Sequence, residues 1–201
     1  MLTLYDYLSS GNGYKCRLLL HQLGIPFRRV ELDIMRGETR TPEFLAKNPN
    51  GRIPALELED GTVLAESNAI MFYLAEGTQL LPADPLQRAQ ALQWLFFEQY
   101  SHEPFIAVAR FIRHLLPEDT PRRAELPRLE KGGNAALGVM EQRLAEHPFL
   151  VGDRYSIADI GLYAYTHVAD EGGLNLAGYP GVRAWLDRVA SQPGHVAISA
   201  G

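Results

Sequence analysis

Short apolar or alternating stretches, each closed by glycine or proline, fill the first third of the chain. Residues 2–6 (LTLYD) predict a strand, and residues 13–24 predict a helix that ends at Gly24. Residues 27–34 alternate between apolar and polar positions, as a half-buried strand does. The chain therefore begins with a strand, a helix and a second strand.

The following residues extend this mixed pattern. Thr41 and Pro42 begin a short predicted helix over 41–48, and residues 53–67 contain two short strands joined by the turn EDG. Residues 68–77 then read as a helix ended by glycine. The order strand–helix–strand–helix–hairpin–helix predicts a small mixed sheet with helices on its faces.

Beyond a connector at residues 78–85, which contains two prolines, every segment has a helical pattern. Pro104 should kink the first of these helices, and Gly132 with Gly133 should weaken the second. The sequence thus predicts an α/β domain at 1–77 and an all-helical domain at 86–201. The four predicted helices cover residues 85–116, 121–146, 156–170 and 180–190.

Composition narrows the function classes. The chain has 201 residues, 46% of them hydrophobic and 21% charged, with a formal net charge of −5. An acidic balance argues against nucleic acid as the main partner, because phosphate binding needs clustered lysine and arginine.

Cys16 is the only cysteine, so no internal disulfide or CxxC pair can form, and no metal site is predicted. Without a signal-peptide pattern or an apolar run of about 20 residues, we expect a cytoplasmic protein that is not in a membrane.

The stretch between the first strand and the first helix holds small and polar residues: Ser9, Ser10, Gly11, Asn12 and Gly13. Such residues cap helices, so the simplest interpretation is a well-formed helix start. A second interpretation is a socket for an anion, where hydroxyl and backbone N–H groups meet the positive end of the helix dipole. The stretch by itself leaves both interpretations open.

Two further stretches suggest how a peptide would be held. Pro54 opens a predicted strand, and a cis bond after Ile53 would expose backbone groups that an extended peptide could pair with, although most X–Pro bonds are trans. Glu66 and Ser67 begin the helix over 68–77. Ser67 is either a structural cap or, with Glu66, a receptor for the carboxylate and ammonium of an α-amino acid.

Four stretches carry a family resemblance. LYDYLSSGNGYKCRLLL, NPNGRIPAL and ESNAI resemble the glutathione-binding half of cytosolic glutathione S-transferases, and HPFLVGDRYSIADI resembles their C-terminal capping segment. In that segment Ser156 and Asp159 form a capping box, which we assign to folding, and losing Asp159 should cost about 0.5–2 kcal/mol. The chain is identified as a member of this superfamily, of the bacterial type with serine and asparagine two residues apart. The resemblance implies a thioredoxin-like N-terminal domain, an all-α C-terminal domain and a homodimer.

The resemblance also implies how glutathione, the co-substrate, is bound. Ile53 and Pro54 would hold its peptide backbone, and Glu66 with Ser67 its γ-glutamyl group. The glycyl carboxylate would pair with a cation near the Ile53–Pro54 bond. The candidates are Arg52 first, then Arg40, and Lys47 last.

In this family the thiol donor follows the first strand. Ser10 is our principal candidate, with Asn12 as a second donor and Ser9 as the close alternative; Tyr5 and Tyr7 are lesser ones. Cys16 lies one turn inside the helix and is expected to be a buried, inert thiol. The candidates for contact with the second, electrophilic substrate are Tyr7, Tyr100, Phe105 and Arg110, with His102, Glu103 and His114 nearby in sequence.

The leading functional prediction is therefore a detoxification-type glutathione S-transferase that joins glutathione to a small, partly apolar electrophile. Two alternatives stay open. One is glutathione-dependent reduction of small disulfides or peroxides. The other is a non-catalytic binding protein that has kept the fold.

Overall fold

The computed structural model describes residues 1–200. Their contacts divide them into two compact units, one made of residues 1–78 together with 193–200 and the other of residues 79–192. The sequence alone assigned the last nine residues to the helical half, whereas the contacts group 193–200 with the first unit. No helix among residues 1–200 has the length and apolar content needed to cross a membrane.

The first unit is built on a four-stranded mixed sheet. Its strand order is β2-β1-β3-β4, in which β1 runs parallel to β2 and antiparallel to β3. Leu4 of β1 pairs with Arg29 and Leu56 on its two sides, so β1 lies inside the sheet. This is the small mixed sheet that the alternating pattern predicts. The strands are β1 (Leu2–Asp6), β2 (Phe27–Glu31), β3 (Ala55–Glu57) and β4 (Val63–Ala65).

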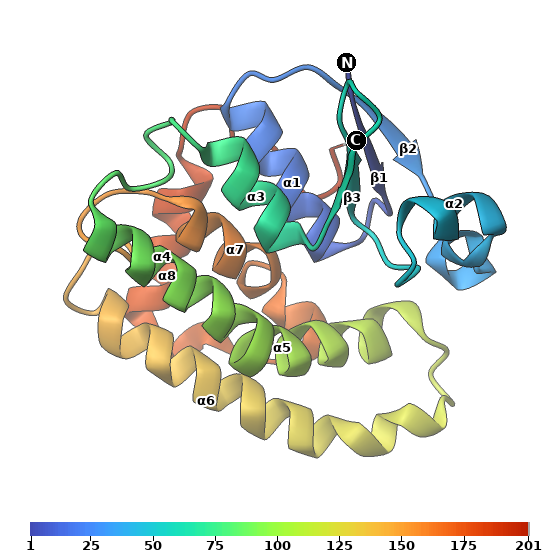
Figure 1. Cartoon of the computed structure of the whole chain (residues 1–201). Helices are drawn as coiled ribbons and strands as arrows, with labels where there is room; N and C mark the ends of the chain where they lie inside the picture. Colours follow the sequence, from blue (N-terminus) through green and yellow to red (C-terminus); the bar gives the residue numbers. More distant parts are fainter. Residues whose placement is uncertain (201) are drawn as a thin grey trace. The chain divides into compact units, whose positions relative to one another are not determined.

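Three helices cover this sheet: α1 (Gly11–Gln22), α2 (Pro42–Lys47) and α3 (Ser67–Ala75). Helices α1 and α3 pack side by side on one face, and α2 lies on the other side (Figure 1). β2 stops three residues short of the predicted strand, because Asp33 caps a 3-10 turn at Ile34–Arg36. The thioredoxin-like arrangement expected from the resemblance is confirmed.

Helix α1 is buried throughout residues 13–20, including the charged Lys15 and Arg17. Arg17 donates hydrogen bonds to Asp6 Oδ2 and to the carbonyl of Leu8, both at 2.7 Å, and to the carbonyl of Ile198 at 2.9 Å. Tyr14 Oη donates to the carbonyl of Val196 at 2.7 Å. Residues 193–200 are therefore fixed to the first unit by side chains of α1.

The second unit is helical throughout. The predicted helix over 85–116 forms as α4 and α5, with one π-helical turn between them (Glu98–His102) and a second after α5 (Phe111–Leu115). Pro104 lies at the start of α5, directly after the first π-helical turn, so the helical hydrogen-bond pattern changes at the proline that the sequence predicts to disturb the helix. The helices are α4 (Pro85–Phe97), α5 (Glu103–Arg110), α6 (Leu126–Leu144), α7 (Ile157–Thr166) and α8 (Pro180–Ala190).

The glycines of α6 have a packing role. A Cβ atom at Gly132 would lie 2.2 Å from the Phe105 ring, and one at Gly133 would lie 2.6 Å from Leu174 Cδ2. Such distances are far below van der Waals contact, so only glycine allows Phe105 and Leu174 to approach this closely. The sequence pattern identified the weak helix propensity but not this compensation.

The capping box before α7 is confirmed. The carboxylate of Asp159 accepts hydrogen bonds from the backbone N–H of Ser156 at 2.9 Å and from its hydroxyl at 3.2 Å. It also accepts from the backbone N–H of Leu150 at 3.0 Å and from Trp185 Nε1 at 2.9 Å. Asp159 is fully buried and joins three segments of the second unit.

Candidate functional site

Ser10 lies at the start of α1 with its side chain at the capping position. Its Oγ accepts a hydrogen bond from the backbone N–H of Gly13 at 3.2 Å, and its own N–H donates to the carbonyl of Tyr7 at 2.8 Å. Accepting this bond leaves the hydroxyl hydrogen able to donate to another group. The capping and anion-binding interpretations of this stretch are thus compatible in one side chain.

The register of the sheet brings Pro54 to the same end as this loop. Tyr5 pairs with Ala55 in an antiparallel ladder, so Pro54, one residue before Ala55, falls opposite the end of β1. The Ile53–Pro54 peptide bond is cis, which is the rarer of the two states and the one that a paired peptide would require. Pro54 is buried and Ile53 is half-buried.

Glu66 has an unusual backbone conformation at the start of α3. Its φ is 67° and its ψ is 111°, and it is the one non-glycine residue with positive φ among residues 1–200. Side chains of L residues disfavour this region, and such conformations gather at ligand sites. Ser67, the first residue of α3, is buried, whereas Glu66 is exposed.

The structure joins the two predicted halves of the site by direct contact. Ser67 Oγ donates a hydrogen bond to Asn12 Oδ1 at 3.1 Å. Lys15, which the sequence analysis did not select, places its Nζ 3.4 Å from both Ser67 Oγ and Asn68 Oδ1. The only sequence signal for Lys15 is a cation inside the apolar run of the first helix.

The candidate cations for a glycyl carboxylate differ in their surroundings. Arg40 and Arg52 are exposed, and Arg40 Nη1 donates to the carbonyl of Asn50 at 3.1 Å. Lys47 forms an ion pair with Glu57 at 2.8 Å. Arg52 adjoins the Ile53–Pro54 bond in the chain, and its carbonyl accepts from Asn48 Nδ2 at 2.7 Å.

Cys16, Tyr5 and Tyr7, the thiol and phenol groups considered from the sequence, each have a raised pKa. Cys16 is fully buried, and burial raises the pKa of its thiol, so it is a poor nucleophile. Tyr5 donates to Glu57 at 2.6 Å, and burial is the main cause that raises its pKa. Burial likewise raises the pKa of Tyr7, with the negative charges of Asp33 and Glu31 as smaller causes.

Comparison with known families identifies both parts of the chain. Residues 1–76 match the model of the glutathione S-transferase N-terminal domain, and residues 92–193 match that of the C-terminal domain. The chain belongs to the glutathione S-transferase family.

Relatives within the transferase family cover nearly the whole chain. A crystal structure of a glutathione S-transferase from Pseudomonas fluorescens is 58% identical, covers 98% of each chain and has a TM-score of 0.94. The Disulfide-bond oxidoreductase YfcG of Escherichia coli is 34% identical over 96% of this chain and 92% of its own. Ure2p in complex with glutathione is 30% identical, covers 100% of this chain and 93% of the other, and has a TM-score of 0.88.

Three of the residues predicted to contact the electrophilic substrate lie in the second unit. Tyr100 is 87% exposed, and Phe105 packs over Gly132. Arg110 is only 4% exposed, and its Nε donates to Glu171 Oε2 at 2.6 Å. The sequence placed Arg110 among the candidates for contact with the electrophile, and the structure gives its guanidinium an acidic partner, Glu171.

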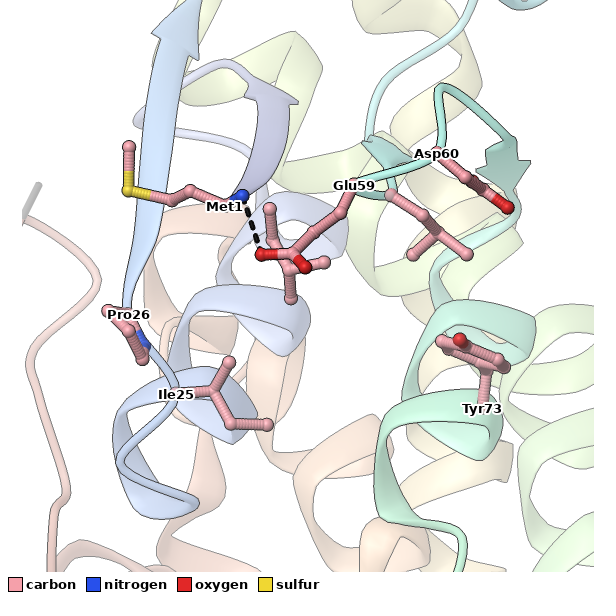
Figure 2. Close-up of a pocket in the computed structure, with 8 residues that line it drawn as sticks. Met1, Ile25, Pro26, Glu59, Asp60 and Tyr73 are labelled. Carbon is pink, nitrogen blue, oxygen red and sulfur yellow. Dashed lines mark ion pairs between the residues drawn. The ribbon is translucent and has the colours of Figure 1, made fainter.

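One hollow of the first unit, with a volume of about 620 Å³, contains none of the candidate residues. It includes Tyr73 and the ion pair between the Met1 ammonium and Glu59, 2.6 Å apart (Figure 2). Its walls include Leu2, at the start of β1, whereas Ser9 and Ser10 follow the other end of that strand. A five-residue strand spans about 13 Å, so this hollow is separate from the candidate site described above.

Proposed function

We propose that this protein is a glutathione transferase in which the Ser10 hydroxyl and the N-terminus of α1 stabilise the glutathione thiolate. The thiolate attacks a small, partly apolar electrophile and forms a carbon–sulfur bond as the leaving group departs. The observation that carries the proposal is the capping geometry of Ser10, whose Oγ accepts from Gly13 while its hydrogen stays able to donate. Asn12 serves as the second donor.

The rest of the tripeptide would lie across the first unit. Ile53 and Pro54 would pair with its backbone. Glu66 would take the γ-glutamyl ammonium, and Ser67 would take the γ-glutamyl carboxylate through its backbone N–H at the start of α3. Arg52, or Arg40, would neutralise the glycyl carboxylate, since both are exposed cations on the segment before Pro54. The glutathione complex of the relative Ure2p supports this ligand. A cytoplasmic homodimer, as the family implies, is part of the proposal.

A hydroxyl donor and a helix N-terminus can stabilise the glutathione thiolate sufficiently without a general base. A free thiol titrates near 8.5, and lowering that pKa by about two units requires about 2.7 kcal/mol. A hydrogen bond to a charged group contributes about 1.5–3 kcal/mol, and a helix N-terminus about 0.3–1 kcal/mol. One hydroxyl and one helix end therefore supply the required stabilisation.

Ser10→Ala tests this mechanism. Turnover should fall about 10- to 100-fold, the loss expected for a hydrogen bond of about 1.5–3 kcal/mol to a charged group, while glutathione affinity stays nearly constant. Ser10→Gly, which also lacks the hydroxyl but caps helices well, should lose as much, and Ser10→Thr should keep most activity. Full activity in Ser10→Ala would transfer the role to Ser9 or Asn12.

A second candidate function is glutathione-dependent disulfide reduction, favoured by the 34% identity to the oxidoreductase YfcG. Two glutathione molecules would reduce one disulfide to two thiols and leave as glutathione disulfide. The first thiolate attacks a disulfide sulfur, and the second resolves the mixed disulfide. The buried Cys16 takes no part in this scheme.

One comparison separates the candidates. Purified protein is assayed with glutathione on a nitroaromatic chloride and on a small disulfide. Faster turnover of the chloride supports conjugation, and faster turnover of the disulfide supports reduction. Calorimetry that detects no glutathione binding would instead favour a non-catalytic binding protein.

A further inference from the structure

We propose that Lys15 is a positioning residue that sets the orientation of the Asn12 amide through Ser67. The inference rests on the proposed function, because Asn12 is there the second donor to the glutathione sulfur. Lys15 is fully buried, and its Nζ lies 3.4 Å from Ser67 Oγ, which in turn lies 3.1 Å from Asn12 Oδ1. These three side chains form one chain of hydrogen bonds between α1 and α3.

The direction of this chain follows from its first member. An ammonium group has three hydrogens and no lone pair, so Lys15 can only donate and Ser67 Oγ must accept. The single hydroxyl hydrogen of Ser67 is then directed at Asn12, which must present its carbonyl oxygen. The Nδ2 end of Asn12 is thereby fixed as its donor end.

This orientation matters for an anion. An asparagine amide carries an acceptor and a donor of nearly equal shape, and a flip exchanges them. The oxygen would repel a thiolate, whereas the N–H group would stabilise it. In the structure Ser67 Oγ accepts from Lys15 on one lone pair and gives its only hydrogen to Asn12 Oδ1. Without the ammonium of Lys15, the Ser67 hydroxyl would be free to rotate and to accept from the Asn12 amide instead.

The buried ion pair beside Lys15 does not take part in this chain of hydrogen bonds. Arg17 and Asp6, the buried charges nearest in sequence, form their own ion pair at 2.7 Å. Asn68 Oδ1 is a second acceptor for Lys15, outside the chain that reaches Asn12. Burying an ammonium group is costly, so replacing Lys15 with an apolar side chain of similar length should not reduce stability.

The test is Lys15→Met in the full-length protein. The readout is the pKa of bound glutathione, measured from thiolate ultraviolet absorbance across pH. We expect this pKa to rise by about one unit and turnover at neutral pH to fall about tenfold, while KM for glutathione changes less than threefold and the thermal midpoint does not fall. Asn68→Ala, the matched control, should leave this pKa unchanged.

A double-mutant cycle separates positioning from a direct effect of charge. In the Asn12→Ala background, Lys15→Met should produce no further rise in the pKa of bound glutathione. An equal rise in both backgrounds, or none in Lys15→Met alone, overturns the inference. A wild-type protein that does not bind glutathione, or does not lower the pKa of its thiol, contradicts the proposed function instead.

A measurement on the free protein covers the case in which Lys15→Met does not fold. In 15N spectra of the wild-type protein, the Asn12 side-chain amide should give one pair of slowly exchanging resonances. Ser67→Ala, which interrupts the same chain, should shift these resonances and speed their exchange. Unchanged resonances and exchange would overturn the inference.

Discussion

At the scale of single residues, buried charges organise both units of this protein. Asp6 and Asp159 are each fully buried, and burial raises the pKa of each carboxyl to about 6. Asp6 is compensated by the Arg17 guanidinium, whereas Asp159 is held by N–H and O–H donors from three segments. Few other side chains could replace these carboxylates, because each carboxylate accepts several hydrogen bonds from donors at fixed positions.

Asp159→Asn should therefore cost more than an ordinary helix cap. An amide offers one acceptor oxygen, and its NH2 group would face donors, so the free energy of unfolding should fall by about 2–4 kcal/mol at pH 7 rather than the 0.5–2 kcal/mol expected from capping alone. Chemical denaturation followed by tryptophan fluorescence measures this loss. A loss below 1 kcal/mol would show that the buried bonds add little.

The difference in stability between the wild type and Asp159→Asn should depend on pH. The pKa of Asp159 is raised in the folded state to about 6 from an ordinary value of 3.8, so the folded protein binds this proton more tightly than the unfolded chain. Its contribution to stability is then fully present below about pH 4 and is lost as the pH rises to about 6. The stability difference between wild type and Asp159→Asn should grow as the pH falls from 7 to 4. A constant difference would indicate an ordinary pKa.

The sequence predicted the roles of single residues correctly where those roles depend on neighbours in the chain, as in helix caps. Ser156 and Asp159 have the spacing of a capping box, and Thr41 with Pro42 has the pattern of a helix start. The buried environment of Lys15 and Arg17 has no local signal, because it arises from helices and a C-terminal segment far away in sequence. A charge in a helix is usually solvated, so the sequence could not identify these two as interior residues.

At the scale of elements, most helix and strand positions followed from periodicity and from glycine and proline. α8 coincides with its predicted range, and the predicted helix over 121–146 forms mainly as α6. The π-helical turns on either side of α5 were not predictable, since residues 92–112 are so rich in apolar side chains that a change in the phase of the apolar pattern leaves no distinct signal.

Helix α6 offers a matched test of its glycines. Gly132→Ala should lower the thermal midpoint, because the new Cβ would overlap the Phe105 ring. Gly138→Ala, in the same helix with no heavy atom within 4 Å of a new Cβ, should raise stability by up to about 1 kcal/mol through helix propensity. If the thermal midpoints of Gly132→Ala and Gly138→Ala shift equally, the Phe105 ring moves aside without a cost in stability.

At the scale of the whole molecule, the first unit is discontinuous in sequence. Its contacts join residues 1–78 with 193–200, and Arg17 donates to the carbonyls of Ile198 and Ala200 as well as to Asp6. The sequence predicted two domains in the correct order, because the change from alternating to helical pattern is local. Recognition of 193–200 as part of the first unit required tertiary contacts.

Arg17→Met should destabilise the first unit and release this segment. Removing one partner of a buried ion pair leaves Asp6 uncompensated, which typically costs about 3–5 kcal/mol. Thermal unfolding and limited proteolysis at residues 193–200 measure the two effects. Arg28→Met, on the exposed face of β2, is the control and should change stability by less than about 0.5 kcal/mol. Equal protease resistance of the two variants would contradict the assigned role of Arg17.

This connectivity has a consequence for synthesis on the ribosome. Translation delivers residues 79–192 before the segment that Tyr14 and Arg17 bind, so the helical unit is complete in sequence while the thioredoxin-like unit still lacks its last piece. The part of the protein that is made first is thus the part that finishes folding last. Until then, the Arg17 guanidinium lacks the carbonyls of Ile198 and Ala200 that accept its hydrogen bonds in the folded protein.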